Sequence, residues 1–377
     1  MSTRVPIRLA AVDLREIRLP LREPFRISSG EMRERRILLL ELVDADGDRV
    51  WSECVAGEVP NYSPETVDTA WLAITRWLAP RLLGREFAAP PAVDEALGKN
   101  VRGHLMARAA LEMGCWGLVA EKAAVSLSQL LGGTRTEIAT GISIGIQRDP
   151  ATLVEKAAAA LAAGYRKIKV KIQPGADVEF VGAVREALGE EAPLMADANN
   201  AYTLDDAEHL ARLDDFRLVM IEQPLGWDDV VRHGELQRRL RTPICLDESI
   251  TGLDKVEDML RLGAGRIVNI KAGRVGGFTS SRAIEDLCRR SGVPVWCGGM
   301  LESGVGRAYN VALASLPGFT IPGDVSPSAR YWERDVVAPE WTMSDGMVTV
   351  PAVQGLGVTV DVDRIDDLTT RRETLTA

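Results

Sequence analysis

Polar residues in the second half of the chain recur at nearly equal intervals, and this spacing constrains the fold more than any other feature. Each stands near the end of a short apolar run, and the six are Lys171, Asp197, Glu222, Asp247, Lys271 and Cys297. Successive members are 26, 25, 25, 24 and 26 residues apart. That interval is typical of one β-strand followed by one helix, so the spacing predicts a βα repeat and a parallel sheet.

The apolar runs are candidate strands, and they alternate with helical stretches rich in Ala, Leu and Arg. Eight of them follow residue 133, at residues 141–146, 168–172, 193–196, 218–221, 244–246, 267–270, 293–296 and 319–321. Eight parallel strands with intervening helices close most simply into a (β/α)8-type barrel, whose catalytic residues lie at the C-terminal strand ends. The alternative is an open doubly wound sheet, but its dinucleotide-binding form needs GxGxxG after the first strand, and that motif is absent there.

The flanking regions lack this repeat and predict additional units. Within residues 1–133, an Asp- and Gly-rich turn joins the runs 37–43 and 50–55 into a predicted hairpin, and helical patterns follow at 63–83 and 104–121. We therefore expect an α+β domain at 1–133 and a barrel at 134–324. The C-terminal segment, 325–377, is expected to pack back on the first domain.

Charge and composition exclude several classes of function. The chain has 377 residues and a net charge of −9, which repels nucleic-acid phosphates. No window holds the roughly 18 consecutive apolar residues of a membrane-spanning helix, and a signal-peptide pattern is lacking, so we expect a soluble cytoplasmic protein without a membrane partner. The five cysteines are scattered without a CxxC, which argues against disulfides and against a structural zinc site.

Three acidic strand ends predict a metal site. Asp197, Glu222 and Asp247 would repel one another in one barrel mouth unless a cation balances their charge. Oxygen ligands without histidine or thiolate suit a hard ion, and Mg²⁺ is the best match, with Mn²⁺ or another divalent ion as a substitute. Each carboxylate alone could instead cap a helix or pair with an arginine, but the equal spacing of three favours the metal.

Lysines at two further strand ends suggest acid–base chemistry. Lys171 and Lys271 end the second and sixth strands, so we expect them to face the barrel axis from opposite sides. Burial and neighbouring cations lower the pKa of a lysine and give access to its neutral form. Lys169, Arg274 and Mg²⁺ would supply those cations. The two lysines could then share acid and base roles in proton abstraction next to a carbonyl group.

The metal and the lysines predict one reaction together. A proton α to a carboxylate is weakly acidic because its removal places a second negative charge on that group. A divalent ion on the carboxylate oxygens stabilises this charge in the enediolate intermediate. The constellation therefore predicts metal-dependent proton abstraction from a small carboxylate substrate, with no cofactor besides the metal.

Longer motifs around these positions resemble a known family. They are Lys169-Val170-Lys171, Asp197-Ala198-Asn199, Ile221-Glu222-Gln223-Pro224, Leu246-Asp247-Glu248-Ser249, Asn269-Ile270-Lys271 with Arg274-Val275-Gly276-Gly277, and Trp296-Cys297-Gly298-Gly299-Met300-Leu301-Glu302-Ser303-Gly304. Together they resemble the muconate-lactonising subgroup of the enolase superfamily. The greatest similarity is to o-succinylbenzoate synthases that also act as N-succinylamino acid (N-acylamino acid) racemases. Enzymes of this superfamily use a lysine or histidine base with one or two Mg²⁺ ions.

The resemblance implies a fold for nearly the whole chain. That fold is a modified TIM barrel, (β/α)7β, with an α+β N-terminal capping domain that the C-terminal tail completes. Residues 24–33 would form a flexible lid over the site, and Tyr62 would belong to a second capping loop. A homo-oligomer is also expected.

The same resemblance implies roles for individual residues. Asp197, Glu222 and Asp247 would bind the metal, and Lys171 and Lys271 would be the acid/base pair. The implied substrate-binding residues are Ser143, Lys169, Asn199, Arg274, Met300 and Glu302.

The leading hypothesis is an o-succinylbenzoate synthase, which catalyses a dehydration in menaquinone biosynthesis, an N-succinylamino acid (N-acylamino acid) racemase, or an enzyme with both activities. Dipeptide epimerase and muconate cycloisomerase are alternatives with the same chemistry. A Schiff-base aldolase would use a desolvated barrel lysine as nucleophile, but three acidic neighbours argue against it. A binding protein without catalysis is the remaining alternative.

Overall fold

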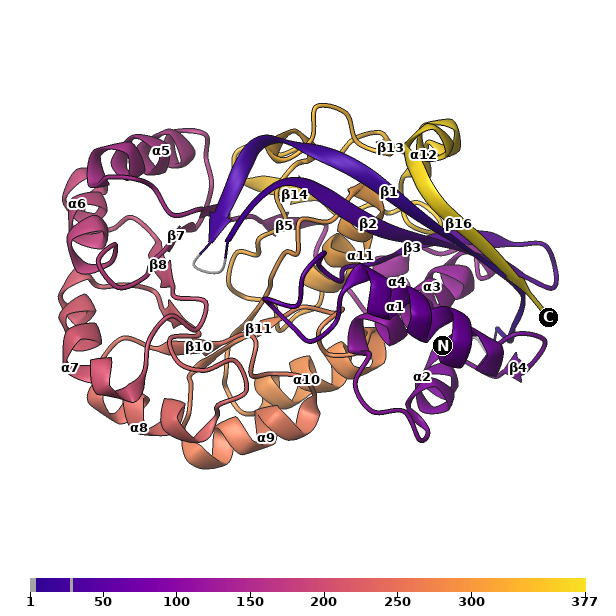
Figure 1. Ribbon diagram of the computed structural model, residues 1–377, viewed down its shortest axis with the longest axis horizontal. Coiled ribbons are helices and arrows are strands. Elements are labelled where there is room, and N and C mark those ends of the chain that lie inside the picture. Colours follow the sequence, from indigo (N-terminus) through magenta and orange to yellow (C-terminus); the bar gives the residue numbers. More distant parts are fainter. Residues whose placement is uncertain (1–4, 28–29) are drawn as a thin grey trace.

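Two structural units make up the described part of the chain, whose computed structural model covers residues 5–27 and 30–377. One is a strand-rich domain that combines N-terminal strands with the last strand of the chain. The other is a curled parallel sheet with helices around its outside (Figure 1). The end of β1 and the start of β2 reach from the first unit over the mouth of the second.

An antiparallel sheet in the order β16-β1-β2-β3 forms the base of the N-terminal domain, with β4 paired to β1. Its strands are β1 (Ile7–Ile27), β2 (Gly30–Asp44), β3 (Arg49–Cys54), β4 (Glu86–Phe87) and β16 (Thr369–Thr376). The predicted hairpin is confirmed as β2 and β3, where Leu38 pairs with Cys54 and Val43 pairs with Arg49.

The N-terminal domain also contains helices, and α3 makes most of their contact with this sheet. They are α1 (Val67–Ala73), α2 (Pro90–Gly98), α3 (Leu105–Lys122) and α4 (Leu127–Leu131). The helix predicted at 104–121 is confirmed as α3, whose residues from Ala109 to Ala120 are buried without interruption. Such complete burial is typical of a helix enclosed between two layers.

The helix predicted at 63–83 is wrong in its start and in its continuity. Thr66, not Ser63, is the N-cap of α1, because its hydroxyl oxygen accepts the Thr69 N–H. After α1 the chain continues as a π-helical turn and a 3-10 turn. Pro80 lies in the second of these turns and lacks the N–H that an α-helix would need there.

The barrel consists of parallel strands in sequence order. Within residues 142–297 they are β6 (Ile142–Ile144), β7 (Ile168–Lys171), β8 (Leu194–Asp197), β9 (Ile221–Glu222), β10 (Ile244–Leu246), β11 (Ile267–Ile270) and β12 (Val295–Cys297). Six of the first seven predicted strands are thereby confirmed, and the fourth, predicted at 218–221, is found later, at Ile221–Glu222. The helices outside them are α5 (Pro150–Ala162), α6 (Val178–Leu188), α7 (Ala207–Leu210), α8 (Val231–Arg239), α9 (Leu253–Leu262), α10 (Phe278–Arg290) and α11 (Gly304–Ala314) (Figure 1).

The eighth predicted strand, at 319–321, is not a regular strand. Isolated parallel bridges join Phe319 to Val295 of β12 and Gly323 to Thr140 before β6. Pro322 has no N–H and interrupts any longer ladder at this point. The segment nevertheless closes the ring between the last and first strands, as expected for a modified (β/α)7β barrel.

The C-terminal segment runs from the barrel to the N-terminal sheet. β14 (Met347–Thr349) pairs with β5 (Glu137–Ala139), and β13 (Val337–Ala338) pairs with β15 (Thr359–Val360). α12 (Val362–Leu368) then leads into β16, which pairs with β1.

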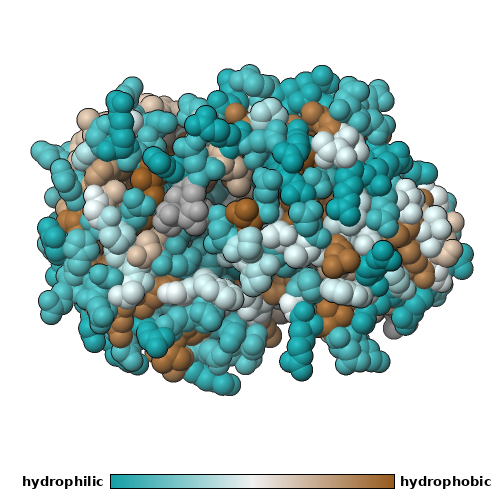
Figure 2. Space-filling view, in the orientation of Figure 1, coloured by the Kyte–Doolittle hydropathy of each residue, from teal (hydrophilic) through white to brown (hydrophobic). Residues whose placement is uncertain are grey.

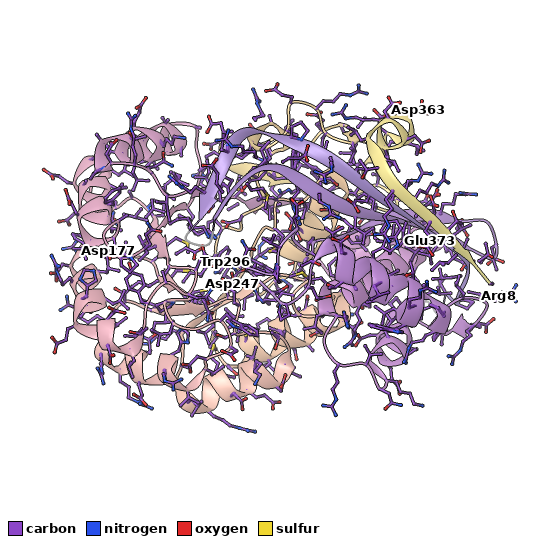
Figure 3. All side chains as sticks on the ribbon, viewed as in Figure 1. Arg8, Asp177, Asp247, Trp296, Asp363 and Glu373 are labelled. Carbon is purple, nitrogen blue, oxygen red and sulfur yellow. The ribbon has the colours of Figure 1, made fainter. Side chains whose placement is uncertain are left out.

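The exterior and the interior of the molecule differ sharply in polarity. Hydrophilic side chains dominate the face shown in Figure 2. None of the helices in the described residues is both long enough and apolar enough to span a bilayer. In Figure 3, Trp296 and Asp247 lie inside the ring of helices, and Asp177 lies at its outer edge. Trp296 is fully buried, so side chains fill the barrel below its mouth.

Candidate active site at the mouth of the barrel

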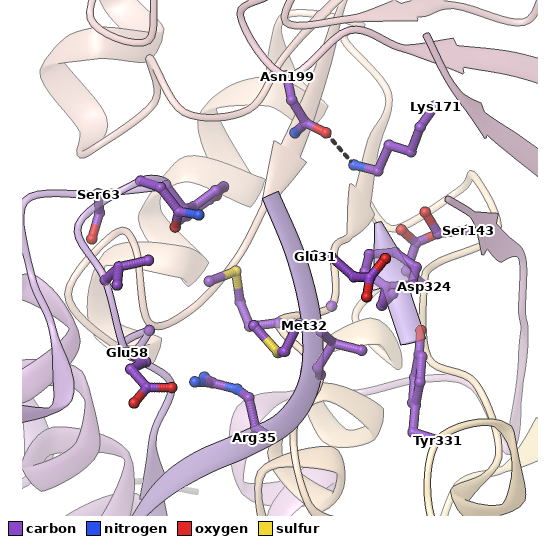
Figure 4. Close-up of a pocket in the computed structure, with 18 of the residues that line it drawn as sticks. Glu31, Met32, Arg35, Glu58, Ser63, Ser143, Lys171, Asn199, Asp324 and Tyr331 are labelled. Atoms are coloured by element: carbon purple, nitrogen blue, oxygen red, sulfur yellow. Dashed lines mark hydrogen bonds between the residues drawn. The ribbon is translucent and has the colours of Figure 1, made fainter. Parts of the chain in front are cut away.

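A cavity of about 400 Å³ lies between the capping domain and the C-terminal ends of the barrel strands. Side chains from both units line it (Figure 4). The capping domain contributes Phe25, Met32, Arg35, Glu58, Val59 and Tyr62, and the barrel contributes Ser143, Lys169, Lys171, Asn199, Lys271, Met300, Leu301 and Asp324. The volume suits a small molecule.

The predicted lid includes the end of β1 and the start of β2. Residues 28 and 29 of the predicted range 24–33 are outside the described residues. On either side of them, Phe25 and Met32 face each other in the strand pairing and line the cavity.

The three acidic strand ends lie next to one another. Asp197 and Glu222 are direct neighbours in the register of β8 and β9, and Asp247 follows the end of β10. All three are almost completely buried. The equal spacing in the sequence thus brings the three carboxylates to the same end of the sheet.

Lysines of β7 bind the first two carboxylates. Lys169 Nζ is 3.1 Å from Glu222 Oε2 and 3.3 Å from Asp197 Oδ2. Lys171 Nζ is 2.6 Å from Asp197 Oδ2 and 2.5 Å from Asn199 Oδ1. Both lysines point inward, because alternate residues of a strand share a face.

Lys271 lies on the other side of the carboxylates and binds the third one. Its Nζ is 2.8 Å from Asp247 Oδ2 and 3.0 Å from the Tyr62 hydroxyl. Arg274 pairs with the other oxygen of Asp247 and donates to Tyr62 at 3.0 Å. Tyr62 completes the cluster by donating to Asp247 Oδ1 at 3.1 Å.

Burial and neighbouring charges together set the pKa values of Asp197, Glu222 and Lys169. Burial raises the pKa of Asp197, but the ammonium groups of Lys171 and Lys169 outweigh it and hold that pKa below its usual range. Burial and the charge of Asp197 raise the pKa of Glu222. Burial lowers the pKa of Lys169, but carboxylates led by Asp324 raise it well above its usual value.

The titration of Lys271 differs from the sequence-based expectation of a lowered value. Burial lowers the pKa of Lys271 and is the largest single influence on it, but Tyr62, Glu222 and Glu248 together outweigh burial, and the result is a raised pKa. The protein groups alone therefore favour the ammonium form, and an additional cation near these carboxylates would act in the opposite direction.

The donor atoms fit a hard divalent cation in their chemistry. The oxygens of Asp197, Glu222 and Asp247 are the available ligands, and Glu248 Oε2 and Asn269 Oδ1 are buried nearby without hydrogen-bond partners. In this structure the carboxylates form ion pairs with lysines and with Arg274. Within residues 5–27 and 30–377, no three Asp, Glu, His or Cys side chains are grouped so that they could hold a metal ion as they stand. An ion would replace part of these ammonium contacts.

The implied substrate-binding residues fall into two groups. Ser143 and Met300 line the cavity, and the Ser143 hydroxyl is buried without a hydrogen-bond partner. Asn199 binds Lys171 and donates to Glu248 at 3.2 Å. Glu302 instead supports the wall from behind, where it accepts the Met300 N–H at 2.9 Å and the Asn310 amide at 2.7 Å.

Sequence reasoning missed Asp324 as a member of the site. Its Oδ2 lies 2.6 Å from Lys169 Nζ, and its Oδ1 lies 3.7 Å from Lys167 Nζ. Lys167 is buried with its ammonium 3.4 Å from the centroid of the Trp296 ring. The spacing could have identified Asp324, because it follows Cys297 by nearly the same interval as the other strand ends.

Comparison with known proteins identifies related sequences over almost the full length. Residues 152–364 match a family model described as enolase C-terminal domain-like, and residues 10–132 match the mandelate racemase/muconate lactonizing enzyme N-terminal domain. The chain is 47% identical over 363 residues to an o-succinylbenzoate synthase of Geobacillus kaustophilus, covering 96% of each chain. It is 46% identical over 366 residues to an N-succinylamino acid racemase of an Amycolatopsis species, covering 97% of this chain and 99% of the relative.

Solved structures agree with these sequence matches. A crystal structure of an enolase superfamily member from Listeria innocua superposes with a TM-score of 0.95 and 38% sequence identity. The superposition covers 98% of this chain and 99% of the other.

Proposed function

Because the chain belongs to the mandelate racemase/muconate lactonizing enzyme family of the enolase superfamily, we propose that it removes a proton α to a carboxylate group. The overall reaction is that of an o-succinylbenzoate synthase, that of an N-succinylamino acid (N-acylamino acid) racemase, or both. The first activity would place the enzyme in menaquinone biosynthesis. Relatives at similar identity bear each of the two names, which supports both activities.

One observation carries this proposal: two lysines approach a single cavity from opposite sides of three carboxylates. Lys171 is bound to Asp197, and Lys271 is bound to Asp247. Both lysines line the cavity. A substrate α-carbon between them would have one amine on each face, which is the arrangement that racemisation requires.

Asp197, Glu222 and Asp247 would hold Mg²⁺ or a similar divalent ion. When bound, that ion supplies positive charge for the second negative charge that develops on the substrate carboxylate. Members of the superfamily generally use Mg²⁺. Assembly into a homo-oligomer and a cytoplasmic location remain predictions, and sedimentation of the purified protein tests the first.

The chain's own residues account for the proton transfers. In racemisation, one neutral lysine takes the proton from Cα on its face, and the other lysine, as an ammonium, donates a proton to the opposite face. In dehydration, Lys171 takes the Cα proton, and its ammonium form then donates a proton to the β-hydroxyl, which leaves as water while the Lys271 ammonium stabilises negative charge. Ser143 and Asn199 are suited to orient the carboxylate, because their polar groups lie at the cavity wall.

The decisive experiment measures both reactions with purified protein. The o-succinylbenzoate precursor and a panel of N-succinyl amino acids are supplied with Mg²⁺, and kcat/KM is compared. We expect turnover that EDTA abolishes and Mg²⁺ restores. Exchange of the α-proton with D2O should accompany racemisation. Activity that survives metal removal, or substrate trapping by borohydride, would exclude this proposal and favour a Schiff-base enzyme.

A further inference from the structure

Two helices of the barrel begin against carboxylates of the capping domain. α10 follows the strand end of Lys271, and α11 follows the wall that contains Met300. On the other side of the barrel, α5 and α6 are capped by the residues that directly precede them, Asp149 and Asp177. The N-cap residue of α10 is a glycine without a side chain to do this. The first N–H groups of α10 therefore need hydrogen-bond acceptors from another part of the chain.

Glu112 of α3 supplies these partners for α10. Its Oε2 accepts the Phe278 N–H at 2.7 Å, and its Oε1 accepts the N–H of Thr279 at 3.0 Å and its hydroxyl at 2.5 Å. Trp116 lies one turn further along α3 and donates its indole N–H to Oε1 at 2.7 Å. The carboxyl group is fully buried. It belongs to the capping domain and binds the start of a barrel helix, so it joins the two domains.

Gly277 is adapted to this contact. It has a φ of +121°, and a Cβ at this position would lie 2.3 Å from Glu112 Oε2. Another residue here would both strain the backbone and displace the carboxylate. Glu112 can therefore approach the start of α10 only because the residue before this helix is a glycine.

Backbone hydrogen bonds connect this cap to Lys271. The Gly277 N–H donates to the Ala272 carbonyl at 2.8 Å, and the Val275 N–H donates to the Lys271 carbonyl at 3.2 Å. The turn from Lys271 to Gly277 is therefore a hydrogen-bonded unit. Its far end is the one that Glu112 holds.

Glu53 of β3 makes the corresponding contact with α11. Its Oε2 accepts the Ser303 N–H at 3.0 Å, the Ser303 hydroxyl at 2.7 Å and the Gly306 N–H at 3.2 Å. Glu53 is 1% exposed, and a Cβ on Gly306 would lie 2.8 Å from Oε2. A glycine again makes room for a carboxylate from the other domain.

Ser303 ends the segment that forms one wall of the cavity. Met300 and Leu301 of this segment line the cavity, and Glu302 holds the Met300 N–H from behind. Glu53 therefore fixes the end of this wall, as Glu112 fixes the end of the Lys271 turn.

We propose that Glu112 and Glu53 are positioning residues for the reaction, through which the capping domain holds Lys271 and the Met300 wall in place. This inference rests on the proposed function and adds two side chains that lie outside the cavity lining. Among the described residues, the hydrogen bonds of Lys171 go to Asp197 and Asn199 of the barrel, so loss of Glu112 affects proton transfer on the Lys271 face. Loss of Glu53 affects substrate binding instead.

The first test is α-proton exchange in D2O with each enantiomer of N-succinylphenylalanine. The variant Lys271→Ala identifies the enantiomer whose proton faces Lys271. In Glu112→Gln, the amide nitrogen would meet the Phe278 N–H, so we expect exchange of that enantiomer to fall about tenfold. Exchange of the other enantiomer should change less than about twofold. Glu53→Gln should raise KM for both enantiomers with little change in kcat.

The second test does not require activity. Backbone amide exchange followed by mass spectrometry should show faster exchange at residues 272–279 in Glu112→Gln and at 298–306 in Glu53→Gln. Asp149→Ala is the matched control, because it removes a helix cap within the barrel. It should leave both segments and both enantiomers unaffected.

Two results would overturn the inference. The first is equal slowing of both enantiomers in Glu112→Gln, which would assign to this residue a role in stability alone. The second is unchanged amide protection at 272–279. If the wild-type protein exchanges neither α-proton, the racemase part of the proposed function fails, and the amide exchange then decides on the positioning roles by itself.

Discussion

The two sides of the active site are built in different ways. The Lys171 side uses barrel residues: Lys171 contacts Asp197 and Asn199, which lie on or just after the next strand. The Lys271 side also depends on the capping domain, because the Tyr62 hydroxyl lies 3.0 Å from Lys271. Glu112 holds the following helix from the same domain.

This difference indicates how each lysine responds to the capping domain. A change in the position of that domain leaves the Lys171 contacts intact but alters the contacts of Lys271. Racemisation needs both lysines, whereas the proposed dehydration needs only one of them as a base. The capping domain therefore controls racemisation more strictly than dehydration in this arrangement.

Replacing each lysine separately is the strongest way to test this comparison. We expect Lys171→Ala to abolish dehydration and to lower α-proton exchange of one enantiomer by roughly 10³-fold. Lys271→Ala should lower exchange of the other enantiomer by a similar factor and abolish racemisation. Exchange is measured by loss of the α-proton signal in D2O. Identical losses for both enantiomers in both variants would show that the two sides are not independent.

The sequence predicted the strand-end residues on both sides of the site but not the contacts that the capping domain makes, for a physical reason. Strand-end positions follow from a repeat of 24 to 26 residues, which places Asp197, Glu222 and Asp247 without knowledge of any distant contact. Contacts such as Glu112 with Phe278 join positions 166 residues apart, and no local pattern encodes them. Local signals also failed where proline intervened, at Pro80 and at Pro322.

The sequence pattern also did not predict the direction in which a buried polar side chain points. Glu302 was expected in the substrate-binding wall, yet its side chain binds Asn310 behind that wall. Motif position determines where the backbone of Glu302 lies. The direction of its side chain depends on partners from α11.

Acid should weaken the barrel at α8, on the Glu222 side of the site. His233 is fully buried, its Nε2 accepts the Leu225 N–H at 3.1 Å, and its Nδ1 contacts the Asp229 carbonyl. Only the neutral ring can accept at Nε2. Burial accordingly lowers the pKa of His233 from 6.5 to about 4.

The sign follows from proton linkage. The unfolded chain binds a proton at His233 below pH 6.5 and the folded chain binds it only near pH 4, so folding stability is fully present above pH 6.5 and falls as the pH decreases. The loss approaches about 3 kcal/mol. Urea unfolding at pH 7 and pH 4.5 measures it, with His233→Gln as the control that lacks this dependence. Equal pH dependence in both proteins would contradict the assignment.

Smaller effects are expected from the groups that contact each lysine without moving protons. Tyr62→Phe removes a hydroxyl from Lys271, Arg274 and Asp247, but these three groups keep their direct contacts with one another. We expect about a tenfold loss of exchange on the Lys271 face, which corresponds to roughly 1.4 kcal/mol. Asn199→Ala should produce a similar loss on the Lys171 face. If Tyr62→Phe slows both faces equally, the hydroxyl acts on the substrate rather than on Lys271, and the two sides share more than their separate contacts suggest.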